Sequence, residues 1–160
     1  ARDPFHPVDE AARALARRLL DRATFAALGV LQEGVPAVTR IACATAPDGG
    51  PLSLISDLST HTAALEADPA CSLLVGEPEQ KGDPLTHPRL TLQATARFIA
   101  RDSADHPVLR AHYLSLRPKA QLYIDFTDFR LVRFDVSTAL LYGGFGRAYK
   151  LSADDLTVKH

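Results

Sequence analysis

The succession of strand-length segments constrains the fold of this chain most strongly. Apolar or alternating runs recur along the sequence, and most are separated only by turn signals such as Pro47–Gly50. We expect strands at residues 24–31, 36–46, 52–57, 71–76, 90–100, 122–126, 129–135 and 138–142. Helical periodicity is confined to residues 9–23, 59–67 and 105–116, so strands and helices do not alternate. This pattern predicts a mainly β (α+β) fold, an antiparallel barrel with peripheral helices, and disfavours a doubly wound nucleotide-binding sheet.

Composition indicates an ordinary globular protein. The 160 residues carry a formal net charge of −1, so neither nucleic acid nor a membrane is an expected partner. No apolar run approaches the ~20 residues that a bilayer span requires. Cys43 and Cys71 lie inside apolar runs, which favours buried thiols and a cytoplasmic location. We expect one domain over residues 1–160, with loosely ordered ends at 1–8 and 152–160.

The common catalytic motifs are absent from the sequence. It contains no HExxH, GxSxG or CxxC, and its six histidines show no metal-ligand spacing, so no metal site is predicted. The glycine-rich stretch at 143–146 lacks the Lys-Ser/Thr of a P-loop and the third glycine of a dinucleotide motif. It favours a bulge or close packing at the end of a strand.

Arg40 is the first candidate binding residue. Strand alternation in "AVTRIACAT" (37–45) places Val38, Arg40, Ala42 and Ala44 on one face. The small neighbours leave space beside the guanidinium. Two interpretations remain open: an arginine that reaches solvent at a barrel rim, or a clamp for an anion.

The second candidate is "SDLSTHTAAL" (56–65), a strand that runs into a helix. Ser59, Thr60 and Thr62 supply hydroxyls, and His61 an imidazole, beside the free backbone N–H groups of the first helical turn. Such a turn suits a phosphate, although simple capping by Ser or Thr is the common case. An adjacent strand could bring Arg40 close, which favours phosphate binding by a cofactor that carries the chemistry itself.

In the order and spacing of its motifs the chain resembles the flavin-binding split-barrel superfamily of pyridoxamine 5′-phosphate oxidase, and more closely the haem-utilisation branch of that superfamily. The resemblance covers nearly all of residues 9–151 and rests on "TRIACA", "SDLSTHTAALEADPACSLLV", "GDPLTHPRLTLQATA", "YLSLRPKAQLYIDFTDFRLVRFD" and "GGFGRAYKL". It implies a homodimer of antiparallel split barrels with FMN in each of two grooves between the chains.

The resemblance also implies roles for individual residues. Arg40 would clamp the FMN phosphate, and Gln93 would reach the cofactor from the neighbouring subunit. Ser59, His61 and Thr62 would form the phosphate loop. Backbone or side-chain contacts to the flavin would come from Ile41, Ser56, Asp57 and Leu58.

The leading functional prediction is therefore an FMN-binding protein, and an FMN-dependent oxidoreductase if it is an enzyme, with an unknown small-molecule substrate. The chain has no Trp and lacks the arginine- and tryptophan-rich C-terminal segment of true pyridoxamine phosphate oxidases, which argues against that activity. A non-catalytic flavin-binding protein is a second possibility.

The third possibility is haem binding or haem degradation in the same groove. The resemblance suggests a C-terminal histidine as iron ligand, and His160 is the only late candidate. Asp125 or Asp128 would be its carboxylate partner, and His61 is the other possible donor.

Overall fold

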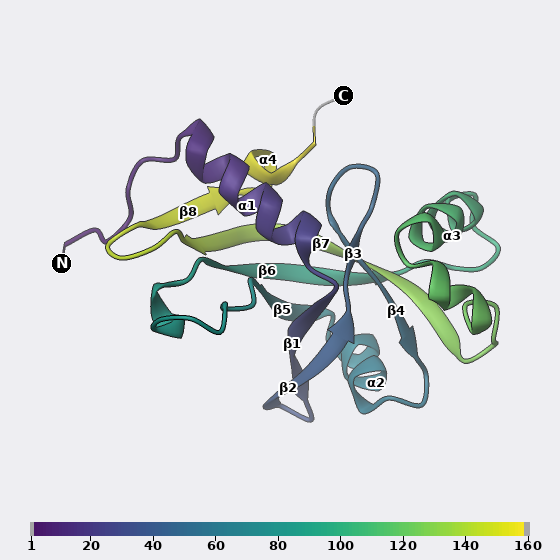
Figure 1. The fold of residues 1–160 in the computed structure, drawn as a ribbon. Coiled ribbons are helices and arrows are strands. Elements are labelled where there is room, and N and C mark those ends of the chain that lie inside the picture. The colour runs from purple at the N-terminus through teal and green to yellow at the C-terminus, as the bar shows by residue number, and fades with distance from the viewer. Residues whose placement is uncertain (1, 159–160) are drawn as a thin grey trace.

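The computed structural model describes residues 2–158 and contains one antiparallel sheet of eight strands (Figure 1). The strands are β1 (Phe25–Gln32), β2 (Val35–Ala42), β3 (Ala44–Thr45), β4 (Pro51–Ser56), β5 (Ala70–Val75), β6 (Arg89–Phe98), β7 (Phe129–Tyr142) and β8 (Ala148–Ser152). Their order is β2-β1-β5-β6-β7-β4-β3, and β8 pairs with β7. Only Cys43 separates β2 from β3, so the two ends of the strand order meet and the sheet curls into a barrel.

The helices lie at the margins of the sheet (Figure 1). They are α1 (Glu10–Arg22), α2 (Thr60–Ala67), α3 (Asp105–Leu116) and α4 (Ala153–Leu156), with 3-10 turns at Pro84–Thr86 and Pro118–Leu122. Asp9 caps α1 by accepting a hydrogen bond from the Ala12 N–H at 2.8 Å. The predicted antiparallel barrel with peripheral helices is confirmed.

Two hydrophobic clusters form the core. The larger fills the barrel and includes the buried faces of α1 and α2, with Leu20 and Leu65 fully enclosed. The smaller lies under α3, around Leu109 and Tyr113. Cys43 belongs to the larger cluster, where burial raises the pKa of its thiol to about 11 and keeps it protonated at neutral pH.

One outward face of the sheet is made of strand residues only. Small, polar and apolar side chains line it. Two adjacent rows of paired residues cross six strands. The first row is Arg40, Ala27, Leu74, Thr91, Leu140 and Lys150. The second is Val38, Gly29, Ser72, Gln93, Thr138 and Ser152. None of these residues is buried, and we call this set the outer face.

Two sequence-based expectations are corrected. Residues 122–126 are not a strand, because Pro118 opens a 3-10 turn and the backbone N–H groups of Tyr123, Ile124 and Phe126 bond to carbonyls three or four residues back. The strands expected at 129–135 and 138–142 are one strand, and Ser137 is the extra residue of a bulge opposite Gln93 and Ala94.

Segments near both ends of the described chain make contacts with the rest of the molecule. Within residues 152–158, Ser152 and Asp155 form a capping box at the start of α4, and Asp155 also pairs with Arg13 of α1 at 2.9 Å. Near the N-terminus, the His6 N–H donates to the Ala148 carbonyl of β8 at 2.8 Å. These contacts hold the segments around His6 and Asp155 against the rest of the chain.

Candidate functional site

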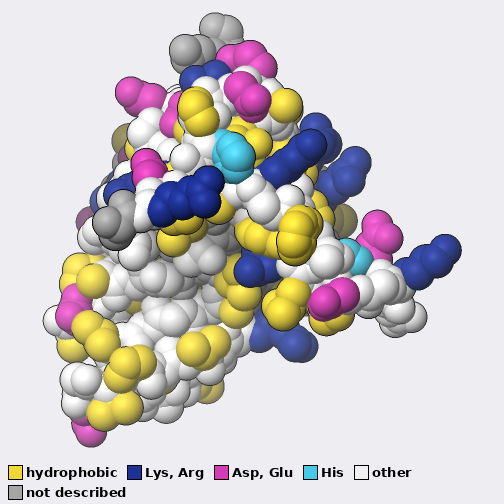
Figure 2. Space-filling view, turned by 90° about the vertical axis from the view of Figure 1, so that its left-hand side faces the viewer, with side chains coloured by type: hydrophobic (Ala, Val, Ile, Leu, Met, Phe, Trp, Pro, Cys, Tyr) yellow, Lys and Arg dark blue, Asp and Glu magenta, His cyan; other side chains and the backbone are white. Residues whose placement is uncertain are grey.

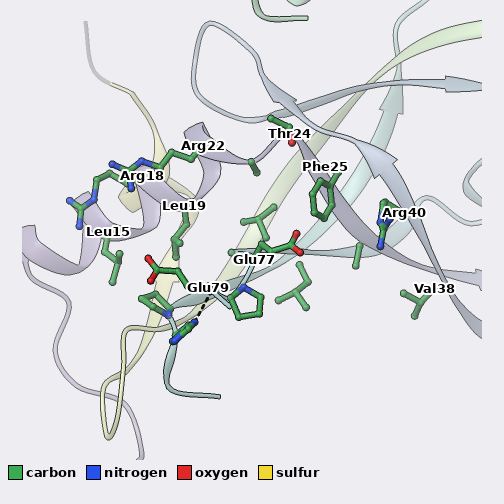
Figure 3. A pocket seen from close by; sticks show the side chains of 18 of the residues that line it. Leu15, Arg18, Leu19, Arg22, Thr24, Phe25, Val38, Arg40, Glu77 and Glu79 are labelled. Carbon is green, nitrogen blue, oxygen red and sulfur yellow. Dashed lines mark hydrogen bonds between the residues drawn. The ribbon is translucent and has the colours of Figure 1, made fainter. Parts of the chain in front are cut away.

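A pocket of about 880 Å³ opens between α1, the β1–β2 hairpin and the segment that joins β5 to β6 (Figure 3). Its apolar wall comes from Leu15 and Leu19 of α1, Phe25 of β1, and Val38 of β2. This volume lies within the range of roughly 300–1,000 Å³ that is usual for cofactor and ligand sites. Figure 2 shows a face of the molecule on which hydrophobic and basic side chains are interspersed.

Three arginines line this pocket. Arg18 and Arg22 lie one turn apart on α1, beside Leu15 and Leu19, and Arg40 projects from β2. Arg40 lies over the Phe25 ring, with its guanidinium carbon 5.2 Å from the ring centroid. Within residues 2–158 none of the three guanidinium groups has an ion pair. They are therefore available to an anionic ligand.

The opposite wall is the β5–β6 segment, which begins at a position that only glycine fits. Gly76 has φ +102°, and a Cβ atom there would lie 2.8 Å from the Pro88 carbonyl oxygen. The segment is then closed by a bond from the Glu79 N–H to Nδ1 of His87 at 2.8 Å. Contacts within the β5–β6 segment therefore fix the shape of this wall of the pocket.

Two carboxylates face the same space. Glu77 and Glu79 line the pocket, and Figure 3 shows the Glu77 side chain on the Phe25 side and the Glu79 side chain toward α1. Neither carboxylate has an ion pair or hydrogen bond within the described part of the chain. The pocket therefore presents charges of both signs around an apolar centre.

The predicted phosphate turn is closed by internal hydrogen bonds. Ser56 Oγ accepts from the Leu58 N–H at 3.1 Å and donates to Asp128 Oδ2 at 3.2 Å. Thr62 is buried and donates its hydroxyl to the Ser56 carbonyl at 2.6 Å. Ser59 occupies the N-cap position of α2 without a side-chain capping bond. The hydroxyls of Ser56 and Thr62 thus stabilise the turn itself.

The other residues of that turn form an ion pair, face solvent or are partly buried. Asp57 pairs with Arg130 at 2.8 Å, and Leu58 is 85% exposed. His61 has a buried Nε2 without a hydrogen-bond partner among residues 2–158, and burial lowers the pKa of its imidazole. The ring is therefore neutral, but this nitrogen is enclosed and does not face the pocket.

The structure brings only some of the predicted residues together. Arg40 lines the pocket, whereas residues 56–62 do not, and Ile41 points into the barrel core. Gln93 lies on the outer face in the row next to that of Arg40, three strands away. The single chain therefore does not form one cavity from Arg40 and the α2 turn.

The expected partners of a C-terminal iron ligand are engaged elsewhere. Asp125 pairs with Arg110 at 2.6 Å, and this hydrogen bond lowers the pKa of the carboxyl. Asp128 accepts from Ser56. His160 lies outside the described residues, which contain no cluster of three or more potential metal ligands.

Sequence reasoning missed most of the pocket. Arg18 and Arg22 lie in the expected helix 9–23, and Glu77, Glu79 and His87 lie between the strands expected at 71–76 and 90–100. The available signal was the i, i+4 spacing of two arginines beside two leucines. That spacing alone does not reveal which surface the helix faces.

Comparison with known proteins identifies the family of this chain. The family model described as "CREG, beta-barrel" matches residues 6–157. The chloroplastic heme oxygenase HOZ of Arabidopsis thaliana is 33% identical over 118 residues, which are 73% of this chain and 35% of HOZ. The heme oxygenase HutZ of Vibrio cholerae is 33% identical over 108 residues, 64% of this chain and 60% of HutZ. The chain thus spans about a third of the length of HOZ and about three fifths of the length of HutZ.

Solved structures agree with the fold. A heme binding protein from Mycobacterium smegmatis superposes with a TM-score of 0.83 at 26% identity, covering 94% of this chain and 61% of that protein. A Clostridium acetobutylicum protein of the pyridoxinephosphate oxidase family superposes with a TM-score of 0.69 at 14% identity, covering 93% and 99%. The second match supports the split-barrel fold alone. No helix within residues 2–158 has the length and apolarity to cross a bilayer.

Proposed function

Because the chain belongs to the CREG beta-barrel family, we propose that it binds haem in the pocket beside Arg40 and serves in haem utilisation. One observation carries this proposal: three guanidinium groups without ion pairs surround an apolar pocket of about 880 Å³. Haem combines a large apolar ring with two propionates, and arginine is the side chain best suited to hold carboxylates. The names of HOZ, HutZ and the mycobacterial protein support the same ligand class.

FMN is the less supported ligand. A flavin phosphate at the α2 turn would compete with the hydrogen bonds that Ser56 and Thr62 already make. That turn is also not part of the pocket that contains Arg40. The predicted flavin-dependent oxidoreductase and the non-catalytic flavin-binding protein therefore rest on the fold resemblance.

The pocket fits the organic part of haem better than its iron. Arg18, Arg22 and Arg40 would hold the propionates, and the leucines of α1 with Phe25 would exclude water from the ring. Bound haem would supply a redox-active iron centre. Among residues 2–158, His87 is the one histidine that lines the pocket, and the N–H of Glu79 already occupies its Nδ1 lone pair. A ring whose Nδ1 accepts this bond carries its proton on Nε2 and offers no lone pair there.

Replacing Arg40 with alanine is expected to weaken haemin binding about tenfold, because a charge-assisted contact to a propionate is lost. Absorbance titration of the purified protein with haemin measures this. Arg147→Ala, on the exposed β7–β8 turn outside the pocket, is the matched control and should bind haemin as the wild type does. Equal haemin affinity in Arg40→Ala and wild type would contradict the site. A parallel titration with FMN tests the flavin alternative.

We also propose that the chain is a homodimer that covers the outer face. Val38 on this face is 77% exposed, and Leu74 and Leu140 are each about 40% exposed. Burying such a face needs a partner surface of at least roughly 500 Å² on each side. A partner there would lie beside Arg40 and Val38 and would narrow the open side of the pocket.

The homodimer predicts a mass twice that of the chain in light scattering at micromolar concentration. Leu140→Asp should shift the protein to the monomer, because the added charge would lose its hydration in the interface. Leu140 does not line the pocket, so the variant tests assembly apart from ligand contacts. Leu122→Asp, at an exposed leucine of the 3-10 turn Pro118–Leu122 that does not belong to the outer face, should leave the dimer intact. A monomeric wild type would refute the assembly.

A further inference from the structure

We infer that the free edge of β2 pairs with the β2 edge of a second copy of this chain, in a register centred on Thr39. Within residues 2–158, β2 lies at one end of the strand order and is hydrogen-bonded to β1 alone. Residues 35, 36, 38 and 40 are exposed, and the β1–β2 hairpin projects at the bottom of the molecule in Figure 1. This pairing does not depend on which ligand the pocket binds.

The backbone of β2 turns unpaired hydrogen-bonding groups toward this edge. The Cys43 N–H donates to the Thr24 carbonyl at 3.0 Å, which makes these two residues a hydrogen-bonded pair just beyond the end of the β1–β2 register. Hydrogen-bonded and non-hydrogen-bonded pairs alternate along an antiparallel ladder. Val38 and Arg40 therefore belong to non-hydrogen-bonded pairs, and their N–H and C=O groups point away from β1. An exposed strand edge of this kind is a template for a further strand.

Two residues limit how such a strand can be placed. By the same alternation, the backbone groups of Pro36 and Ala42 also point away from β1. Pro36 has no N–H to donate. The Ala42 carbonyl already accepts a hydrogen bond from the Ser53 hydroxyl of β4 at 2.6 Å. The edge thus lacks a donor at Pro36 and a free acceptor at Ala42.

These two deficits coincide in one antiparallel register. If Val38 of each copy lies opposite Arg40 of the other, each pair exchanges both of its N–H···O=C bonds. Pro36 then lies opposite Ala42 of the other copy, so the missing donor meets the acceptor that is already in use. The Ala42 N–H can still donate to the Pro36 carbonyl. The two-fold axis passes through Thr39, which makes the contact self-complementary.

The neighbouring registers match less well. Pairing Arg40 with Arg40 of the second copy places two cations directly opposite each other, which is destabilising. It also sets the Val38 N–H opposite the Ala42 carbonyl that Ser53 occupies. Pairing Val38 with Val38 sets Pro36 opposite Arg40 and leaves the Arg40 carbonyl without a donor. Of the three registers, only the one centred on Thr39 avoids these losses.

The side chains of β2 are compatible with this contact. The strand sequence VPAVTRIA holds no Lys, Asp or Glu, the charges that commonly protect an edge strand, and the register centred on Thr39 accommodates Pro36. The one charged side chain, Arg40, lies over the Phe25 ring of β1. Side chains of the outer face project from the sheet, whereas edge hydrogen bonds lie in its plane. The two contacts therefore use different directions, and edge pairing joins two of the proposed outer-face dimers.

A cysteine placed on the two-fold axis tests the register. In Thr39→Cys the two cysteines would form a non-hydrogen-bonded pair with Cα atoms about 4.5 Å apart, within the range of a disulfide. Val35→Cys is the matched control, because Val35 is 64% exposed but its two copies would lie about 27 Å apart in this register. We expect diamide to convert Thr39→Cys to a covalent dimer at least about tenfold faster than Val35→Cys on a non-reducing gel. Wild type gives the background from Cys43 and Cys71.

Val38→Pro tests the hydrogen bonds themselves. It removes an N–H that points away from β1, so the β1–β2 pairing is retained, and far-ultraviolet circular dichroism checks this. Added to Thr39→Cys, it should slow the cross-linking about tenfold, because one bond of each Val38–Arg40 pair is lost. Cross-linking of Thr39→Cys that is no faster than that of Val35→Cys, or is unaffected by Val38→Pro, would overturn the edge pairing.

Mass measurement separates the edge contact from the proposed dimer. At about 1 mM, where a contact as small as one strand pair is expected to form, wild type should approach the mass of four chains and Leu140→Asp the mass of two. Leu140→Asp that remains monomeric at this concentration would overturn the edge pairing and leave the outer-face dimer standing. Cross-linking of Thr39→Cys without haemin binding would overturn only the proposed function of the pocket.

Discussion

Gly76→Ala is expected to destabilise the protein by about 3 kcal/mol or more. The residue has φ +102°, a region that side chains rarely adopt, and its Cβ would lie 2.8 Å from the Pro88 carbonyl oxygen and 2.9 Å from the Arg89 Cα. Both neighbours are backbone atoms, so no side chain can rotate away. Urea denaturation followed by far-ultraviolet circular dichroism measures the loss.

Gly144→Ala is the matched control for this effect. Gly144 also has positive φ, +125°, but nothing lies within 4 Å of the added Cβ. It should therefore show the conformational cost alone, and the difference between the variants gives the steric cost at Gly76. An equal loss of stability in both variants would mean that the added Cβ meets no steric clash at Gly76, where the β5–β6 segment begins. Gly76→Ala should also weaken haemin binding, because the segment forms one wall of the pocket.

Replacing Arg117 with alanine is the second large effect, and we expect a loss of about 2–4 kcal/mol in the free energy of unfolding. The guanidinium donates to the Cys43 carbonyl at 2.6 Å and to the Ala23 carbonyl at 2.9 Å. It thereby joins the end of α3 to the junction of α1 with β1 and to the residue between β2 and β3. Its removal leaves both carbonyls without this charged donor.

Two controls distinguish this role from a general effect of charge. Arg117→Lys keeps the charge but lacks the planar fork, so it should recover only part of the stability. Arg110→Ala removes a second arginine of α3, which pairs with Asp125 at the surface, and should have little effect. Thermal or urea unfolding compares all three variants. A similarly small loss at Arg117 and Arg110 would refute the structural role of Arg117.

The sequence placed the Arg40 side chain correctly, whereas its role in binding stays a prediction. Alternation in 37–45 correctly separated exposed Arg40 from buried Ile41 and Cys43, because a strand has a strict two-residue period. The hydroxyl-rich turn was correctly placed at the start of α2. Its composition did not show that Asp128, from a distant segment, would accept from Ser56. A phosphate turn and an internally bonded turn have the same local sequence.

The sequence by itself determined the class of fold, because turn residues and hydrophobic periods act over a few residues at a time. It therefore indicated short antiparallel strands, marginal helices and a barrel. Only the tertiary structure decided which face of α1 lines the pocket that β1 and β2 also line, and that choice places Arg18, Arg22 and Arg40 around one pocket. It also decided that residues 76–88 fold back through Gly76 and His87 to bring Glu77 and Glu79 to the same pocket. These contacts join residues far apart in the chain, and their geometry depends on strand register and packing, which no local pattern encodes.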